Sequence, residues 1–222
     1  MFSKMIQKVN IFDINISQQE NYLKISFPNL DYKKENHPYC GMSLKNAGSM
    51  RFRNAETNQN RIDFFSSIGI DINRVVQPEL SHSKEVYNCF QDDFHNPLFE
   101  SFLTKSIQQN AVIGDGIITK EKNFVPVITV ADCVPIWFYD PVSKVFGIVH
   151  SGWKGTGIIE NALLFAEKKY NAKIPDFRVI IGPHIHSCCY KVDQEREKFF
   201  NSNFAPDTCE NQMLSLEKAN LF

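Results

Sequence analysis

The pattern of hydrophobic residues along the chain changes between the period of a strand and the period of a helix. Residues 21–28 alternate in polarity, as a strand does, and end at a proline. In the middle of the chain, three apolar runs are rich in residues that favour strands, and further strands are predicted on either side of them. The runs are 123–130, 134–139 and 144–150, and the further strands are 73–77, 84–89 and 177–182. Because hydrophobic residues occupy both faces of the middle runs, the sheet they form is expected to be covered on both sides.

Helical spacing occurs in four segments, which are 51–69, 97–110, 156–170 and a segment that opens at Asp193 and is expected to be the last helix. In the first, Ile62, Phe65 and Ile68 share a face and Gly69 is a C-terminal stop. In the second, Leu98, Phe102 and Ile107 point inward. In the third, Thr156 is the candidate N-cap. The predicted fold is a single layered α/β (α+β) domain over residues 1–222, with a mixed β-sheet covered by helices on both faces.

The turn DPVS at 140–143 has Asp and Pro in the order that suits a type I turn. A four-residue loop there pairs Tyr139 with Lys144. Counting back along both strands places Cys133 opposite His150. Directly opposed residues share a face of the sheet, with Cβ atoms about 4.5–5.5 Å apart. The hairpin therefore predicts a thiol and an imidazole in contact at its open end.

A cysteine beside a histidine allows two chemistries. The pair can ligate a metal such as zinc, or the imidazole can activate Cys133 as a thiolate nucleophile. A buried thiol packed against a histidine is the alternative without chemistry. The sequence of this hairpin alone leaves all three interpretations open.

The glycine-rich segment SGWKGTG directly follows His150 and precedes a predicted helix. Backbone N–H groups at a helix N-terminus bind anions, and phosphate is the obvious guest. Lys154 would add a positive charge, and Gly155 and Thr156 would add backbone donors. The alternative is an ordinary turn between a strand and a helix.

Composition removes several classes of function. The 222 residues carry 24 basic and 25 acidic side chains, a net charge of −1, which gives no electrostatic footprint for nucleic acid or for an anionic membrane. The sequence has no run of 18 apolar residues, so no transmembrane helix is predicted. The N-terminus lacks the apolar core of a secretory signal. A cytoplasmic monomer is therefore expected, with its six cysteines present as thiols or ligands rather than disulfides.

Four segments together resemble one protein family. They are DGIIT (115–119), ADCVP (131–135), HSGWKGTG (150–157) and IGPHIHSCCYKV (181–192). They are similar to the hallmarks of the laccase-domain, multicopper polyphenol oxidoreductase-like proteins of the YfiH type. This family is also called the peptidoglycan-editing-factor or purine-nucleoside-phosphorylase-like family. The resemblance runs from about Gly41 to Val192.

The resemblance implies a metal site with two histidines and one cysteine. Cys133 matches the cysteine of the family's ADC motif, and His150 matches the histidine of its H-x-G-W motif. The family's other histidine lies upstream in a Gln-Val-His-Gly segment, for which ELSHS at 79–83 is the matching place, so His82 is the implied third ligand. His95, in a polar loop, is the alternative. Three ligands leave one position of a zinc ion open, as in catalytic sites.

The implied activity is metal-dependent chemistry on purine nucleosides. It comprises phosphorolysis of adenosine or inosine to the base and ribose 1-phosphate, and deamination of adenosine. Zinc is the expected metal, with copper possible, and a purine nucleoside and phosphate are the expected small-molecule partners. Asp115 is either a general acid or base beside the metal or part of an Asx turn. The catalytic residues implied are Cys133, His150 and Asp115.

The sequence departs from the family pattern in two places. His184 and His186 stand where family members more often have Cys and Gly, and they are either extra metal contacts or ordinary loop histidines. The family's usual C-terminal segment, a Thr-containing stretch and an Arg-rich strand region, has no counterpart after LSLEKANLF. That departure bears more on activity than on metal binding.

Other polar and aromatic residues have plainer roles. Asp132 is expected to make structural hydrogen bonds, and Trp153 to lie in the core. Cys188 and Cys189 are expected to be buried thiols, with lining of the site as the alternative. Arg51 or Arg53 could reach a substrate from a solvated helix face.

Three further functions compete with the nucleoside enzyme. The first is a cysteine hydrolase that uses Cys133 and His150 on a peptidoglycan precursor. The second is a copper-dependent polyphenol oxidase, which six scattered histidines support poorly because multicopper sites need many. The third is a binding module that retains an inactive site.

Overall fold

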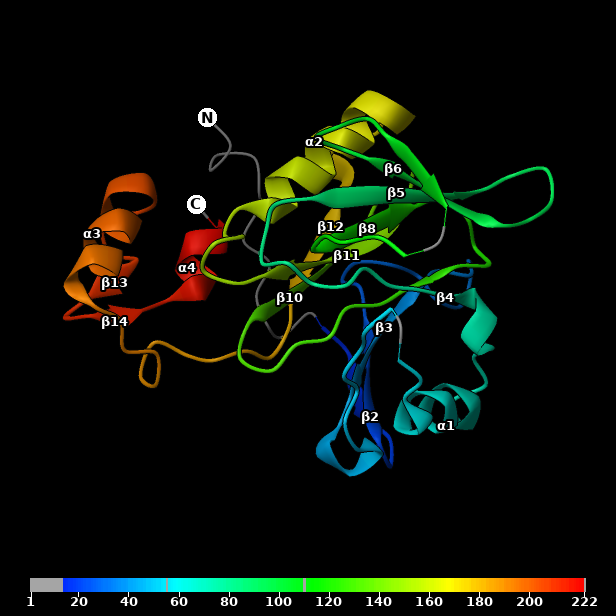
Figure 1. The fold of residues 1–222 in the computed structure, drawn as a ribbon, viewed down its shortest axis with the longest axis horizontal. Helices are drawn as coiled ribbons and strands as arrows, with labels where there is room; N and C mark the ends of the chain where they lie inside the picture. Colours follow the sequence, from blue (N-terminus) through cyan, green and yellow to red (C-terminus); the bar gives the residue numbers. More distant parts are fainter. Residues whose placement is uncertain (1–13, 55, 110, 222) are drawn as a thin grey trace.

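A seven-stranded mixed sheet forms the centre of the protein (Figure 1). The computed structural model describes residues 14–54, 56–109 and 111–221. In spatial order, the strands are β12 (Arg178–Ile181), β10 (Val134–Tyr139), β11 (Phe146–Ser151), β8 (Gly116–Thr119), β5 (Val86–Gln91), β6 (Pro97–Ser101) and β7 (Ile107–Gln109). Only β5 and β8 run parallel among the neighbouring pairs, so the predicted mixed sheet is confirmed.

The remaining strands form three smaller sheets. They are β1 (Ile16–Gln18), β2 (Tyr22–Ser26) and β3 (Tyr39–Ser43) in one sheet, β4 (Val75–Val76) with β9 (Val125–Pro126), and β13 (Cys209–Glu210) with β14 (Met213–Leu214). The α-helices are α1 (Gln59–Ser67), α2 (Ile158–Tyr170), α3 (Gln194–Asn203) and α4 (Leu216–Leu221), and short 3₁₀ turns cover Lys45–Ala47, Ile72–Arg74 and Ile174–Asp176.

Both faces of the central sheet are buried, as the apolar runs 134–139 and 144–150 predict. The run 123–130, expected in the same sheet, forms only β9, which pairs with β4 outside it. All six residues of β10 are buried, and its side chains alternate between two cores. Phe138 joins the core beneath α2, whereas Trp137 and Tyr139 join a second core with Ile25 and Phe27. Helix α2 therefore covers one face, and the sheet β1–β2–β3 covers much of the other (Figure 1).

Helix α2 buries the predicted apolar stripe. Its buried residues are Ile158, Ile159, Ala162, Leu163, Phe165 and Ala166. The prediction that Thr156 caps this helix is wrong, because the N-cap is Gly157, in the left-handed conformation at φ 86°. The Thr156 hydroxyl instead donates to the carbonyl oxygens of Gly152 and Trp153, at 3.1 Å each. These two hydrogen bonds stabilise the glycine-rich turn between β11 and α2.

The predicted helix over 97–110 is wrong. Pro97–Ser101 is strand β6, which pairs with β5, and Ile107, expected to point inward, is 65% exposed. The Asp92 carboxylate accepts the N–H groups of Phe94 and Asn96 and closes a tight turn before β6. Pairing along the edge of the sheet therefore overrides the helical spacing of this segment.

The predicted helix over 51–69 is present only in its second half. Asn58 accepts the N–H of Asn60 and caps α1, so the helix begins at Gln59. The same side chain donates to the carbonyl oxygens of Ser49 and Arg51. Because Asn58 binds these two carbonyls, residues 49–51 lie against the N-terminus of the helix rather than extending it.

The β10–β11 hairpin differs in register from the prediction. Tyr139 pairs with Phe146 and Pro135 pairs with His150, so Cys133 is not directly opposite His150. The Asp140 carboxylate accepts the N–H groups of Val142 and Ser143. The loop between the strands covers residues 140–145, two more than predicted at its C-terminal end. The resulting slip is two residues, which keeps every side chain on its predicted face.

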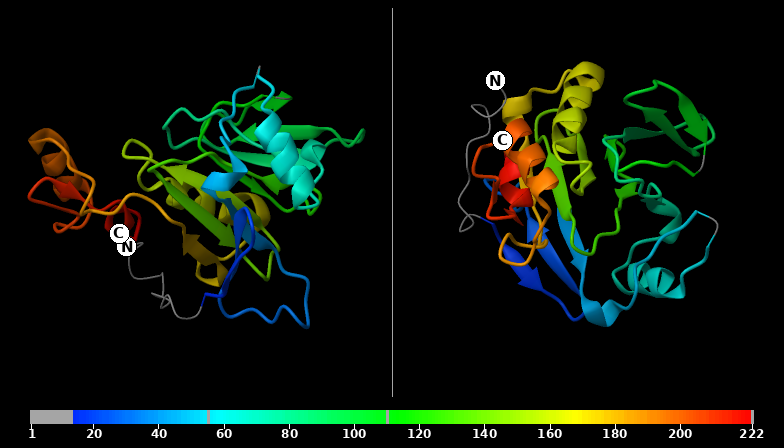
Figure 2. Two further views of the ribbon diagram at one scale, coloured as in Figure 1. Left: turned by 90° about the horizontal axis from the view of Figure 1, so that it is seen from below. Right: turned by 60° about the vertical axis from the view of Figure 1, so that its left-hand side comes forward.

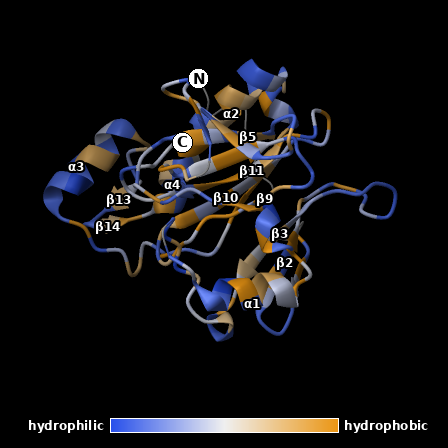
Figure 3. Ribbon diagram, turned by 45° about the vertical axis from the view of Figure 1, so that its right-hand side comes forward, coloured by the Kyte–Doolittle hydropathy of each residue, from blue (hydrophilic) through white to orange (hydrophobic). Residues whose placement is uncertain are grey.

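The C-terminal part of the chain extends beyond the sheet. Helix α3, the β13–β14 pair and helix α4 lie to one side of the central strands (Figures 1 and 2). Asp193 caps α3 as predicted, but α3 is not the last helix because α4 follows it. Figure 3 shows that α3 is mostly hydrophilic, in contrast to the central strands. Its buried residue, Phe200, joins the core beneath α2.

Among residues 14–54, 56–109 and 111–221, no helix is both long enough and apolar enough to cross a bilayer.

Candidate metal centre

Two histidines and one cysteine converge at the open end of the β10–β11 hairpin. One ligating atom from each of His82, Cys133 and His150 lies within 4.8 Å of the others. His150 is buried in β11, Cys133 immediately precedes β10 and is half-buried, and His82 lies in the loop before β5. The rings of His82 and His150 meet edge-on, with centroids 5.0 Å apart. His95 is exposed in the turn between β5 and β6 and is not in this cluster.

Asp115 forms hydrogen bonds with both histidines of the cluster. Its buried carboxylate accepts a hydrogen bond of 2.8 Å from His150 Nδ1, which leaves Nε2 of that ring for the cluster. It also accepts the N–H of His82 at 3.0 Å and the N–H of Ser83 at 2.6 Å. The hydroxyl groups of Ser81 and Ser83 donate to the same carboxylate. Asp115 therefore fixes both a histidine ring and the loop that carries the other histidine.

The pKa values of this pair follow from their contacts. Burial alone would raise the pKa of Asp115, but the hydrogen bonds from His150 and Ser83 outweigh it and hold that pKa below its usual value. Burial alone would lower the pKa of His150. The hydrogen bonds to Asp115 and Cys133 outweigh it and raise that pKa to about 9. Asp115 is therefore the charged member that stabilises a proton on His150 Nδ1.

Two glycines allow this close arrangement. A Cβ on Gly152 would lie 3.2 Å from Cys133 Sγ and 3.3 Å from His82 Cδ2, so any side chain there would enter the cluster. A Cβ on Gly155 would lie 2.6 Å from the backbone oxygen of Ser83. The turn after His150 thus packs directly against the loop that carries His82.

The residues expected to bind phosphate lie beside this cluster in the chain. Lys154 is exposed, with its ammonium 5.4 Å from the Trp153 ring centroid. Gly155 and Thr156 are buried. At the start of α2, Asn220 accepts the N–H of Gly157 at 3.3 Å, so a side chain from α4 lies at this helix terminus.

The other candidates supply no ligating atom to this cluster. Arg51 and Arg53 are exposed and pair with Glu56 and Glu79, each at 3.5 Å. Cys188 and Cys189 are exposed, so the expectation of buried thiols is wrong.

Trp153, expected in the core, is only half-buried, with the Arg196 guanidinium 4.4 Å from its ring centroid.

The sequence patterns did not identify four residues of the site, which are Ser81, Ser83, Gly152 and Asn220. The serines flanking His82 and the glycine after His150 were the available signals.

Comparison with known proteins places the chain in a family. Residues 36–221 match the family described as multi-copper polyphenol oxidoreductase laccase. The chain belongs to this family.

Named relatives and solved structures agree with this assignment. The chain is 38% identical over 95 residues to a purine nucleoside phosphorylase from Borreliella burgdorferi, which covers 42% of each protein. It is 43% identical over 81 residues to purine nucleoside phosphorylase YlmD from Bacillus subtilis, covering 36% of this chain and 29% of that protein.

The crystal structure of YlmD from Geobacillus stearothermophilus matches with a TM-score of 0.59 at 27% identity, over 72% of this chain and 61% of that one. The matches to the two curated relatives thus span less than half the length of each.

The laccase-like chain has the donor set that a zinc ion prefers. Two imidazoles and one thiol are the ligand types of catalytic zinc sites with three protein ligands. The carboxylate behind His150 supplies the outer contact that metal-binding histidines usually have. Gly152 has no side chain, which leaves room beside Cys133 and His82. On these three observations, the residues fit a zinc ion.

Proposed function

We propose that this chain is a metal-dependent enzyme that acts on purine nucleosides. It cleaves adenosine or inosine with phosphate to give the free base and ribose 1-phosphate, and it also deaminates adenosine. The observation that carries the proposal is the convergence of His82, Cys133 and His150 around the glycine at position 152. The names of the similar proteins from Borreliella burgdorferi and Bacillus subtilis support the choice of substrate.

The three ligands would hold a zinc ion, with copper as the alternative metal. When bound, the metal would supply Lewis-acid chemistry at the open end of the hairpin. His150 contributes Nε2, since its Nδ1 proton is held by Asp115. Asp115 thus acts as a positioning residue whose charge keeps His150 in the ligating tautomer.

Phosphate would bind beside the metal, at the turn between β11 and α2. Lys154 contributes an exposed positive charge, and Gly155 and Thr156 contribute backbone N–H groups. The Thr156 hydroxyl already donates to backbone carbonyl oxygens, so its part in phosphate binding is through the backbone.

The experiment is a product assay with the full chain purified without chelator. Adenosine and inosine are incubated with and without phosphate, and products are separated by chromatography. Release of free base that requires phosphate is the expected result, together with some inosine from adenosine. Absence of both products from wild-type protein that contains zinc would overturn the proposal.

A cysteine hydrolase is the second candidate, because Asp115, His150 and Cys133 lie in the order of a catalytic triad. Its substrate would be a peptidoglycan precursor. Alkylation of the native protein, followed by peptide mapping of Cys133, separates the two functions. A zinc-bound thiol resists the reagent, whereas a free nucleophile reacts fastest of all cysteines.

A further inference from the structure

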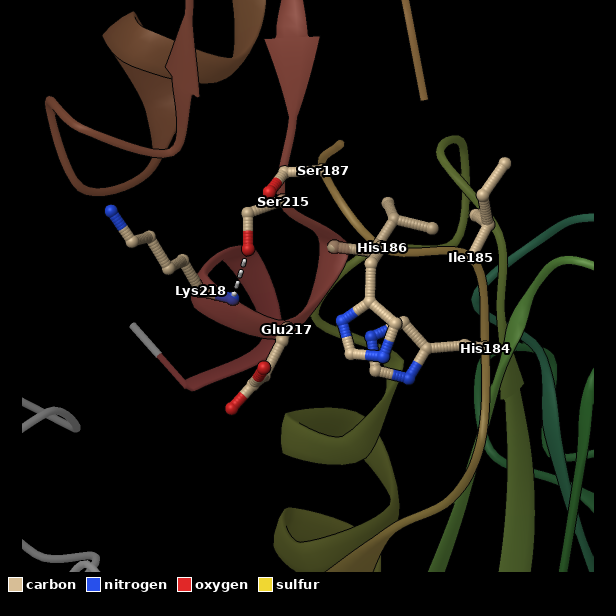
Figure 4. A pocket seen from close by; sticks show the side chains of 8 residues that line it. His184, Ile185, His186, Ser187, Ser215, Glu217 and Lys218 are labelled. Carbon is tan, nitrogen blue, oxygen red and sulfur yellow. Dashed lines mark hydrogen bonds between the residues drawn. The ribbon is translucent and has the colours of Figure 1, made fainter. Parts of the chain in front are cut away.

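A second group of ligating side chains lies outside the candidate metal centre. One ligating atom from each of His184, His186 and Glu217 lies within 4.8 Å of the others. The histidines follow strand β12, and Glu217 lies in the first turn of α4 (Figure 4). The cluster therefore joins the end of the central sheet to the C-terminal extension.

The backbone between the two histidines is anchored to the segment that precedes β10. The N–H of Ile185 donates to the carbonyl oxygen of Asp132 at 2.9 Å, directly before Cys133. The rings of His184 and His186 stack on one side of this segment, with centroids 5.2 Å apart and planes 26° apart (Figure 4). Anchoring of Ile185 thus presents both imidazoles toward α4 rather than leaving them on a free loop.

The orientation of His184 suits a metal ligand. Its Nδ1 donates to the carbonyl oxygen of Gly182 at 2.7 Å, which fixes the tautomer and leaves the Nε2 lone pair unprotonated. A hydrogen bond from the ring nitrogen that does not bind the metal to a carbonyl oxygen is the usual outer contact of metal-binding histidines.

The charge around the cluster is also suitable. The neighbouring Lys218 ammonium pairs with the Asp207 carboxylate at 2.6 Å and points away from Glu217 (Figure 4). The Glu217 carboxylate is thus not neutralised by its neighbour in the chain. A hollow of about 300 Å³ lies at this place and is lined in part by Ser187 and Ser215, with room for water or a further ligand.

We propose that His184, His186 and Glu217 form a second metal site, which binds a divalent transition-metal ion of the zinc class. Two imidazoles and one carboxylate are a known zinc ligand set that leaves a position open. The bound ion would link α4 to the segment after β12. This site is independent of the proposed activity on nucleosides, because none of its ligands belongs to the first cluster.

The test isolates the second site in full-length Cys133→Ala protein, whose first site is disabled. The protein is freed of metal with chelator, loaded with zinc chloride, desalted and analysed for zinc. We expect one equivalent in Cys133→Ala, none in Cys133→Ala/His186→Ala, and at least about tenfold weaker binding in Cys133→Ala/Glu217→Gln. Zinc should also raise the melting temperature of Cys133→Ala, raise that of Cys133→Ala/Glu217→Gln by less, and leave that of Cys133→Ala/His186→Ala unchanged.

Matched controls use residues of the same type outside the cluster, in the same Cys133→Ala background. His95→Ala and Glu167→Gln change exposed side chains and should retain one equivalent. Cys188→Ser/Cys189→Ser should retain it as well, and loss of zinc there would assign the ion to the exposed thiols instead. The second site is refuted if Cys133→Ala binds no zinc, or if His186→Ala leaves its zinc content and melting shift unchanged. Glu217→Gln, an exposed and isosteric change, serves if the histidine variant does not fold.

Discussion

At the scale of single residues, Asp115 connects the most parts of the candidate metal centre. One buried carboxylate accepts from the ring of His150, from the backbone of His82 and from two serine hydroxyls. Replacement of Asp115 therefore changes both the tautomer of His150 and the conformation of the loop that carries His82. Its effect on metal binding should therefore exceed that of an ordinary buried hydrogen bond.

Asp115→Asn tests this role. The amide keeps the size of the carboxylate but loses the charge that holds the proton on His150 Nδ1. We expect zinc affinity to fall by about 10–100-fold, the usual effect of losing an outer contact. Competition with a chromophoric chelator measures the affinity, and circular dichroism confirms folding. Unchanged affinity in a folded variant would show that Asp115 is only structural.

His82→Ala tests the ligand that rests on the resemblance rather than on strand geometry. Removal of one of three ligands should lower zinc affinity by more than about tenfold, whereas His95→Ala should not change it. The same chelator competition gives both values, each in the His186→Ala background so that only the first site is measured. If the two variants behave alike, the upstream ligand is misassigned.

Sequence reasoning predicts these residues to different degrees. Cys133 and His150 follow from strand alternation, because a slip of two residues does not change faces. His82 could come only from the family resemblance, since its loop is brought to the hairpin by long-range contacts. The hydroxyl groups of Ser81 and Ser83 depend on that loop's conformation, with His82 at φ 59°, which no local pattern specifies.

At the scale of elements, the hairpin and the turn that follows it build the site. Strand β10 was predicted with its observed bounds, because its apolar run is buried on both faces. The segment 97–110 was not, because hydrophobic residues in a short hairpin can match a helical period by chance. Pairing with β5 then decides the outcome, and pairing partners are not visible in local spacing.

Gly155→Ala tests how tightly the turn after His150 packs. The new Cβ would approach the Ser83 backbone oxygen to 2.6 Å, and backbone cannot rotate away as a side chain can. We expect a loss of about 1–3 kcal/mol in the free energy of unfolding, measured by urea denaturation of metal-free protein. Gly41→Ala is the control, because its Cβ would lie 4.0 Å from the nearest backbone oxygen. Equal stability of the two variants would contradict the close packing.

At the scale of the whole molecule, one side chain ties the C-terminal extension to the central sheet. Asn220 Oδ1 accepts from the Ser151 hydroxyl at 2.7 Å and from the N–H of Gly157 at 3.3 Å. Its amide group donates to Leu216 within α4. Helix α4 is thereby fixed against both the end of β11 and the start of α2.

Asn220→Ala should leave the buried Ser151 hydroxyl without its acceptor. The expected loss is about 1–3 kcal/mol in the free energy of unfolding, read from urea denaturation. Asn203→Ala, at an exposed position in α3, should change stability by less than about 0.5 kcal/mol. A loss at Asn220 no larger than that at Asn203 would mean that α4 is not fixed through this contact.

The proposed nucleoside-cleaving function depends on Cys133 as a metal ligand. The most direct measurement is zinc content by elemental analysis, together with phosphate-dependent base release, for wild type and Cys133→Ala loaded in parallel. We expect the variant to hold one equivalent of zinc less than wild type and to release no base. Equal zinc content in the two proteins, or full activity in the variant, would contradict it.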